Sequence, residues 1–203
     1  MGMYIAGAGG FGRETLDAAI AADIGVTAFL DDAKAGSTIR GRPVLAPDDV
    51  RAGSYAVGIA EPVARQEMVR RLEAAGLAPA TIIHPRAIIA PETTLGSGCV
   101  VLANAHVSSS ISIGDHVQVN YNVTIGHDAV LDDFVTIYPG ANVSGNVHLG
   151  QGVTLGSNSC VLQGLRIGHH AFVGAGAVVT RDQPAEVTLV GIPARVMTTQ
   201  PVF

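Results

Sequence analysis

An aliphatic residue stands at every sixth position from Ile83 to Val179, and this period organises most of the chain. Steps of six give seventeen positions over that range, and each one is Ile, Leu or Val. Most residues four places after them are small or β-branched, such as Val117, Ala129 and Ala141. An α-helix cannot use this period, because six residues rotate it through about 600° and scatter the apolar side chains. The pattern predicts a solenoid of short strands, with one bulky and one small inward position per unit.

Three six-residue units make a coil of eighteen residues, and glycines recur on this longer spacing. They are Gly96, Gly114, Gly150 and Gly168, and only Asp132 interrupts the column. We expect these positions at a corner that needs a positive φ, which glycine adopts readily and Asp tolerates. Stacked coils would pair as parallel strands about 4.8 Å apart, so about five and a half coils would form a prism ~26 Å long.

Before the repeat, the chain reads as a strand, a glycine turn, a helix and a second strand. An apolar run at residues 3–6 leads into Gly7-Ala8-Gly9-Gly10-Phe11-Gly12, and helix-forming residues 13–22 precede an apolar run at 26–30. This order and the GxGxxG spacing are typical of nucleotide-binding βαβ units, in which backbone N–H groups meet a phosphate. Asp31 and Asp32 end the second strand, where a carboxylate commonly takes ribose hydroxyls. The alternative interpretation is a tight strand–helix turn that binds no ligand.

The same motif would suit an NAD-dependent oxidoreductase, but the α/β stretch is short. Residues 43–45 and 54–59 read as strands and 61–75 as a helix, which completes only a half-sized, Rossmann-like α/β unit. Residues 76–79, Gly-Leu-Ala-Pro, read as a linker. We therefore expect two domains, a nucleotide-sugar-binding domain over residues 1–80 and a solenoid with a C-terminal tail over 81–203.

Composition narrows the class of protein further. The chain lacks Trp, has few aromatic residues, and carries a net charge of −5 without a run of Lys or Arg. This charge argues against nucleic acid or an anionic membrane as the main partner. No apolar run reaches the roughly 20 residues of a membrane span, and the first residues lack a signal-peptide pattern. We expect a cytoplasmic protein whose two cysteines, Cys99 and Cys160, are reduced thiols.

Five motifs in order resemble one family. They are GAGGFG at residues 7–12, the pair Asp31-Asp32, IIHP at 82–85, IGHD at 125–128 and VGIPAR at 190–195. The set is similar to the bacterial sugar acyltransferases, which include the UDP-4-amino-sugar N-acetyltransferases and the sialic acid O-acetyltransferases. The resemblance implies a nucleotide-sugar domain, a hexapeptide-repeat left-handed parallel β-helix and acetyl-CoA as cosubstrate. It also implies a homotrimer with active sites between neighbouring subunits.

The resemblance assigns three catalytic residues. His127 matches the family's general base, a role that suits histidine because its side chain titrates near neutral pH. Asp128 matches the carboxylate that supports this base, and Gly145 matches the backbone N–H that stabilises the oxyanion. Successive residues of a strand point to opposite faces, so Asp128 can reach His127 only where the backbone bends. From spacing alone, His127 would be a solvated corner histidine.

The resemblance also assigns the binding residues. The nucleotide sugar would contact the glycine turn, the acidic pair, and two further positions: Gly9, Gly10, Phe11, Asp31, Asp32, Gly58 and Asn120. Acetyl-CoA would contact Thr136, Gly145, Ser157 and Ala175. Family members often carry a second histidine where this chain has Thr136. A single-chain metal site is not expected, because four of the seven histidines are 21 residues apart and do not stack in the coils.

The function expected from these residues is acetyl-CoA-dependent N-acetylation of a nucleotide-linked 4-amino-4,6-dideoxy sugar, with UDP as the favoured nucleotide. Transfer would be direct, with the His127 base and no covalent intermediate. A sugar O-acetyltransferase of the sialic acid type remains open, because a histidine base serves a hydroxyl acceptor equally well. A non-catalytic protein that binds a sugar nucleotide is the third interpretation.

Overall fold

The N-terminal part of the chain is a small α/β unit. This computed structural model describes residues 2–197. Within that range, six strands form one sheet in the order β3-β4-β2-β1-β5-β6, in which only β3 and β4 pair in antiparallel fashion. Its elements are β1 (Met3–Ala6), α1 (Gly10–Ala21), β2 (Ala28–Leu30), β3 (Thr38–Ile39), β4 (Arg42–Leu45), a 3-10 turn (Pro47–Asp49), β5 (Ser54–Val57), α2 (Pro62–Ala74) and β6 (Ala78–Pro79). The strands β1, β2, β4 and β5 pair in parallel, as the βαβ pattern predicts.

Helix α2 begins with a well-formed cap. The Glu61 carboxylate accepts hydrogen bonds from the N–H groups of Val63 and Ala64, and Pro62 occupies the first turn, where its missing N–H is not needed. Helix α1 instead begins directly from the glycine turn, and no side chain of the described residues caps it. Its first N–H groups are therefore left facing the turn.

The segment expected to be a linker is part of the α/β unit. Leu77 is buried in the core of this unit, and Ala78–Pro79 form strand β6, which pairs with β5. Proline is tolerated there because β6 lies at the edge of the sheet. The interpretation of residues 76–79 as a linker was wrong, because this Gly and Pro lie at an edge strand of the sheet.

The rest of the chain is the expected left-handed parallel β-helix. One sheet, here called the docking sheet, contains β7 (Ile82–Ile83), β10 (Val100–Val101), β13 (Gln118–Val119), β16 (Thr136–Ile137), β19 (Thr154–Leu155), β22 (Phe172–Val173), β24 (Thr188–Val190) and β25 (Arg195–Val196). A six-stranded sheet contains β8 (Ile88–Ile89), β11 (His106–Val107), β14 (Thr124–Ile125), β17 (Asn142–Val143), β20 (Cys160–Val161) and β23 (Val178–Val179). A five-stranded sheet contains β9 (Thr94–Leu95), β12 (Ser112–Ile113), β15 (Val130–Leu131), β18 (His148–Leu149) and β21 (Arg166–Ile167).

Partner residues on successive coils are eighteen apart, as in Val101 with Val119, so each turn of the solenoid uses three six-residue units. The aliphatic series forms the interior, and every member from Val101 to Val179 is buried. Ile83, the first member, is 38% exposed, because no coil lies below it. At the other end, Ala194 of the GIPAR segment is buried against the last coils, and β25 pairs with β24 in antiparallel fashion.

The glycine column serves a different purpose from the one expected. The residues with positive φ lie two places later, at positions such as Gly98 and His116, whereas Gly96 and Gly114 are outside the left-handed region. A Cβ on Gly96 would lie 2.5 Å from the backbone of Gly114 on the next coil. Glycine is favoured there by the close approach of stacked backbones, although Asp132 shows that the column can accommodate one side chain.

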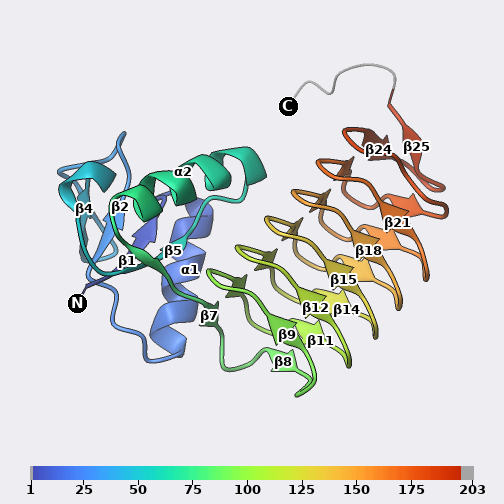
Figure 1. Cartoon of the computed structure of the whole chain (residues 1–203), viewed down its shortest axis with the longest axis horizontal. Coiled ribbons are helices and arrows are strands. Elements are labelled where there is room, and N and C mark those ends of the chain that lie inside the picture. The colour runs from blue at the N-terminus through green and yellow to red at the C-terminus, as the bar shows by residue number, and fades with distance from the viewer. Residues whose placement is uncertain (1, 198–203) are drawn as a thin grey trace.

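The α/β unit packs against the docking sheet beside the first coils (Figure 1). Val100 and Leu102 of the solenoid share one hydrophobic cluster with Ile5, Leu16 and Phe29 of the α/β unit. The other two sheets of the solenoid face away from this contact. Cys99 and Cys160 are both free thiols, and within residues 2–197 neither helix is long and apolar enough to cross a membrane.

Candidate active site

The corner that joins the six-stranded and five-stranded sheets carries a His-Asp pair. His127 Nδ1 lies 2.7 Å from Asp128 Oδ2, and both side chains are about half exposed. The bend that the sequence required is present, since Asp128 has a φ of 59°. This left-handed residue interrupts the alternation of the strand, so two consecutive side chains meet. The carboxylate can accept a hydrogen bond from the Nδ1–H group. In that tautomer Nε2 carries a free lone pair and can act as a base.

Gly145 lies directly across from the His127 ring. A Cβ on Gly145 would come within 2.6 Å of His127 Nε2, so only glycine leaves the ring its present place. The Gly145 N–H donates no hydrogen bond to any residue in the described part of the chain. A Cβ on Gly126 would lie 2.5 Å from the backbone nitrogen of Gly145. Two glycines on neighbouring coils thus keep an unpaired N–H next to the free nitrogen of a histidine.

A pocket of about 520 Å³ occupies the carboxyl ends of the central strands of the α/β sheet. Six of the seven residues expected to bind the nucleotide sugar line it, namely Gly9, Gly10, Phe11, Asp31, Asp32 and Gly58. Leu30, Ile59, Ala60 and Met68 add apolar surface. The N-terminus of α1, at Gly9 and Gly10, also lines this pocket. Its free N–H groups and the helix dipole favour the binding of an anionic group.

The two aspartates of this pocket are already engaged within the protein. Asp31 accepts hydrogen bonds from the N–H groups of Ala8 and Ala33, which closes the glycine turn onto the end of β2. Asp32 forms a bidentate pair with Arg71, whose hydrogen bonds hold the pKa of the Asp32 carboxyl below its ordinary value. Arg71 also binds Asp48, so this cation is shared between two carboxylates.

Lys34 is a site residue that the motif analysis missed. Its Nζ donates a 2.8 Å hydrogen bond to the carbonyl of Ala8, in the middle of the glycine turn. The ammonium retains two further donors and adds a positive charge beside the N-terminus of α1. The sequence feature that could have indicated Lys34 is its position three residues after Asp31. A long side chain just after the end of β2 can reach the neighbouring glycine turn.

The expected cofactor residues do not lie together. Ser157 and Ala175 occupy equivalent places on two successive coils, at the corner between the docking sheet and the six-stranded sheet, and both are at least partly exposed. Thr136 is fully buried instead, where its hydroxyl donates to the carbonyl of Ala60 and accepts from Arg65. The expectation that Thr136 contacts acetyl-CoA was therefore wrong for this chain, because the α/β unit covers it.

Asn120 is also inside the protein. It is only 2% exposed and lies one coil below Tyr138, and its buried Nδ2 has no hydrogen-bond partner among residues 2–197. It does not line the nucleotide pocket, so within one chain it lies apart from the other six residues expected to bind the substrate.

Two families match the chain in separate segments. The PglD N-terminal domain matches residues 3–72, and the bacterial transferase hexapeptide (six repeats) matches residues 146–181. GDP-perosamine N-acetyltransferase of Escherichia coli O157:H7 is 34% identical over 148 residues, which is 67% of either protein. The chain belongs to the hexapeptide-repeat sugar acetyltransferases.

Solved structures of this acetyltransferase family share the whole architecture. A His-to-Asn variant of perosamine N-acetyltransferase from Caulobacter crescentus, in complex with CoA and GDP-perosamine, has a TM-score of 0.94 at 28% identity and covers 98% of both chains. The acetyltransferase domain of PglB from Neisseria gonorrhoeae, in complex with acetyl coenzyme A, has a TM-score of 0.90 at 33% identity and covers 96% of this chain and 98% of that one. These similarities argue against the oxidoreductase and the non-catalytic interpretations.

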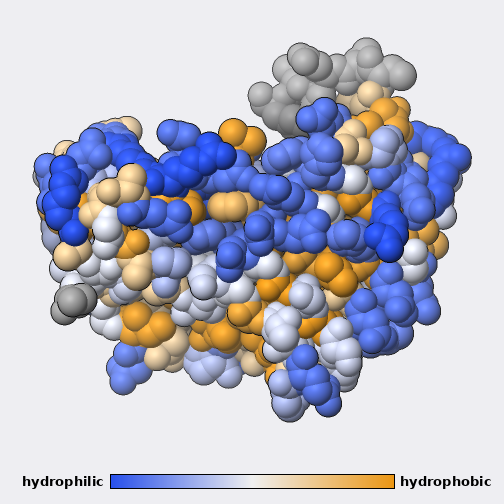
Figure 2. Space-filling model, viewed as in Figure 1, coloured by the Kyte–Doolittle hydropathy of each residue, from blue (hydrophilic) through white to orange (hydrophobic). Residues whose placement is uncertain are grey.

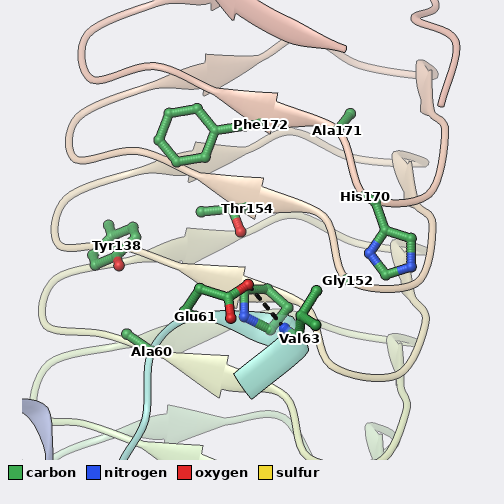
Figure 3. A pocket seen from close by; sticks show the side chains of 10 residues that line it. Ala60, Glu61, Val63, Tyr138, Gly152, Thr154, His170, Ala171 and Phe172 are labelled. Carbon is green, nitrogen blue, oxygen red and sulfur yellow. Dashed lines mark hydrogen bonds between the residues drawn. The ribbon is translucent and has the colours of Figure 1, made fainter. Parts of the chain in front are cut away.

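This acetyltransferase has a second, smaller pocket of about 250 Å³ between the start of α2 and the docking sheet (Figure 3). Tyr138, Thr154 and Phe172 line it from three successive coils, opposite Glu61 and Val63. Ala60 lines this pocket and the nucleotide pocket, so one short loop separates the two. Over the described residues, no group of three or more His, Cys, Asp or Glu is arranged to hold a metal ion.

Proposed function

We propose that this acetyltransferase transfers the acetyl group of acetyl-CoA to the 4-amino group of a nucleotide-linked 4-amino-4,6-dideoxy sugar. The observation that supports this most directly is the His127–Asp128 pair beside the unpaired Gly145 N–H. It supplies a base for the acceptor and a donor for the oxyanion within one solenoid corner. The names of the relatives, which are N-acetyltransferases, favour an amine over a hydroxyl acceptor.

The first chemical step needs a free amine. An amino sugar is an ammonium ion at neutral pH, and His127 Nε2 would accept one of its protons. The resulting imidazolium would keep its Nδ1–H bonded to the Asp128 carboxylate, which stabilises the added charge. The amine nitrogen then attacks the thioester carbonyl carbon. The tetrahedral centre releases the second proton of its nitrogen to solvent and loses the CoA thiolate. The proton held by His127 can return to that thiolate, so the reaction yields an amide and free CoA thiol.

The Gly145 N–H would stabilise the oxyanion of the tetrahedral centre. A preorganised backbone donor at such a position is worth about 10²-fold or more in turnover. Acetyl-CoA would reach this corner from Ser157 and Ala175, which stay proposed contacts. Thr136 is buried beneath the α/β unit, so acetyl-CoA would not contact it.

A second copy of the chain would complete the site. The nucleotide pocket belongs to the unit on the docking sheet, whereas His127 lies on the corner formed by the other two sheets. Those two sheets also expose aliphatic residues, including Ile88 at 59% and Val130 at 39%. Figure 2 shows hydrophobic residues gathered over part of the solenoid face. A homotrimer with active sites between subunits accounts for both features, and a cytoplasmic location remains part of the proposal.

The proposed nucleotide is GDP and not the UDP that the sequence favoured. One relative, at 34% identity, is named for GDP-perosamine, and a structure at 28% identity contains GDP-perosamine. The pocket itself offers apolar surface and engaged carboxylates, features that suit either base.

The test is release of free CoA thiol from acetyl-CoA with GDP-perosamine, UDP-linked 4-amino sugars and free sialic acid. We expect turnover on the GDP-linked sugar and a fall in kcat of about 10²–10⁴-fold for His127→Ala. His169→Ala is the control, because His169 is exposed at a corner between the five-stranded sheet and the docking sheet and takes no part in the proposed site. Turnover on sialic acid alone would establish an O-acetyltransferase, and an active His127→Ala enzyme would remove the proposed base.

A further inference from the structure

Arg65 of α2 is a buried cation that binds carbonyl groups and not a carboxylate. It is 1% exposed, and within residues 2–197 it forms no ion pair. Nη1 donates to the carbonyls of Ile59 and Ala60, each at 2.9 Å. Nη2 donates to the carbonyl of Phe134 at 2.5 Å and to the hydroxyl of Thr136 at 2.9 Å. One guanidinium therefore joins the α/β unit to the solenoid.

Two side chains of the docking sheet bind the same stretch of backbone. Thr136 Oγ1 donates a 2.8 Å hydrogen bond to the carbonyl of Ala60. Gln118 Nε2 donates to the carbonyls of Val57 at 2.8 Å and Ile59 at 3.0 Å. Together with Arg65, they engage three carbonyls of residues 57–60, which are the end of β5 and the loop after it, from the side that faces the solenoid.

The opposite side of this loop is a wall of the nucleotide pocket, to which Gly58, Ile59 and Ala60 contribute. The loop also packs against the glycine turn, since a Cβ on Gly58 would lie 2.5 Å from the Cα of Gly12. Its backbone is therefore held between the turn that would contact the nucleotide and the three side chains behind it. A shift of the loop toward the solenoid would widen the pocket directly.

The geometry requires an arginine at position 65. Burial lowers the pKa of the Arg65 guanidinium to about 10, so it remains charged at neutral pH. A planar fork can point one nitrogen at the loop and the other at the solenoid, whereas a lysine ammonium is a single point. Loss of the fork would leave buried carbonyls without donors, and they would regain partners only by moving.

We propose that Arg65, Thr136 and Gln118 are positioning residues that set the affinity for the nucleotide by holding the loop of residues 57–60 in place. They touch no substrate, and two of them belong to the solenoid. This inference rests on the proposed function, because it takes the pocket at the glycine turn as the nucleotide site. It also accounts for the burial of Thr136 at a position where the resemblance implied a cofactor contact.

The experiment compares Thr136→Val with Thr136→Ser and Thr154→Val. Valine matches the shape of threonine but removes the hydroxyl, and serine restores it. Thr154 is the matched control, because it occupies the same place one coil later, is also buried, and forms no hydrogen bond with residues 57–60. Calorimetric titration with GDP and with UDP gives Kd, steady-state kinetics give kcat and both KM values, and thermal unfolding gives Tm.

We expect Thr136→Val to raise the Kd of the bound nucleotide and the KM of the nucleotide sugar about fivefold, with kcat and the KM of acetyl-CoA within twofold of wild type. Thr136→Ser and Thr154→Val should resemble wild type in both constants. Arg65→Lys should raise the same two constants further if it folds. A lower Tm with an unchanged nucleotide Kd, or an equal rise in both KM values, would overturn the inference. Wild-type protein that binds neither nucleotide would refute the proposed site itself, which is a separate result.

Discussion

His127 Nδ1 and Asp128 Oδ2 are 2.7 Å apart although their residues are neighbours in the chain. In a regular strand these side chains would point to opposite faces, and the φ of 59° at Asp128 brings them together. Asp128 is one of many corner residues in this conformation, which recurs at six-residue intervals along the solenoid. The repeat provides a bend at each corner. At this corner the two residues are His127 and Asp128, so the bend pairs a histidine with a carboxylate and makes His127 a candidate base.

Replacing Asp128 with Asn tests the carboxylate without disturbing the corner. Asn occupies the same left-handed position at four other corners, namely Asn104, Asn122, Asn146 and Asn158, so we expect Asp128→Asn to fold normally. It removes the negative charge that stabilises a protonated His127, and kcat should fall about tenfold. Initial-rate kinetics with both substrates measure this effect. Wild-type kcat in this variant would show that the carboxylate serves only to shape the turn.

Gly145→Ala tests the space beside the base. The new methyl group would lie 2.6 Å from His127 Nε2 and would displace the half-exposed ring, while the backbone at this residue does not require glycine. We expect kcat to fall by about 10²-fold. The free energy of unfolding should change by less than about 1 kcal/mol, because the ring can move aside. Ser144→Ala is the neighbouring control, and full activity of Gly145→Ala would exclude a close role for this residue.

Lys34 is the single lysine of the chain, which makes it accessible to selective chemistry. Its ammonium lies on the glycine turn, and a charged hydrogen bond to a phosphate there would contribute strongly to nucleotide binding. We expect Lys34→Met to raise the KM of the nucleotide sugar about tenfold and to leave that of acetyl-CoA unchanged. Reductive methylation of Lys34, followed by mass spectrometry, should be slowed by bound GDP. Equal labelling with and without nucleotide would place the diphosphate elsewhere.

His116 should make the stability of the protein depend on pH. Its ring is stacked between Tyr55 and Phe134, with centroids 6.1 Å and 5.2 Å away, and burial lowers its pKa. Nearby carboxylates of Asp115, Asp133 and Glu73 oppose this shift, and the guanidinium of Arg65 adds to it. The pKa of His116 in the folded state lies below the ordinary value of about 6.5. At a pH between these two pKa values, the unfolded chain therefore binds more protons than the folded protein. The free energy of unfolding should therefore decrease as the pH falls below about 6.5.

His116→Phe removes this titration and should keep the stack. Phe134 already occupies the equivalent place one coil later with a φ of 59°, so phenylalanine fits the backbone there. Urea unfolding at pH 7.5 and 5.5 should show a smaller loss of stability for this variant than for wild type. His106→Gln, at an exposed position, should behave as wild type does. Equal losses in all three proteins would show that other groups cause the pH dependence.

The solenoid was predictable because one short unit repeats its inward positions without a break, and eighteen-residue pairing follows from three such units. The role of the glycine column was not predictable in the same way. A glycine that relieves a close approach and a glycine that adopts a positive φ look alike in sequence, and only the contact of Gly96 with the next coil distinguishes them. Leu77 was misjudged for a similar reason, because Gly and Pro beside it also occur at sheet edges.

At the site, the residues around the glycine turn came from a local motif, and the structure gathers them in one pocket. Thr136 could not be placed from sequence, because its environment depends on how the α/β unit lies on the docking sheet. Arg65 and Gln118 belong to none of the motifs found in the sequence. Contacts between residues far apart in the chain determine their roles, and a single sequence does not display such contacts.

The long sequence separation of the Arg65 contacts has a consequence during synthesis. The guanidinium binds partners that lie 69 to 71 residues further along the chain. A ribosome makes the whole α/β unit before it makes those partners, so at that stage the unit lacks the support behind one wall of its pocket. If Arg65 sets the nucleotide affinity as proposed, the full affinity would be reached only after the coils through residue 136 have packed against α2, and a chain cut short before them would bind the nucleotide more weakly.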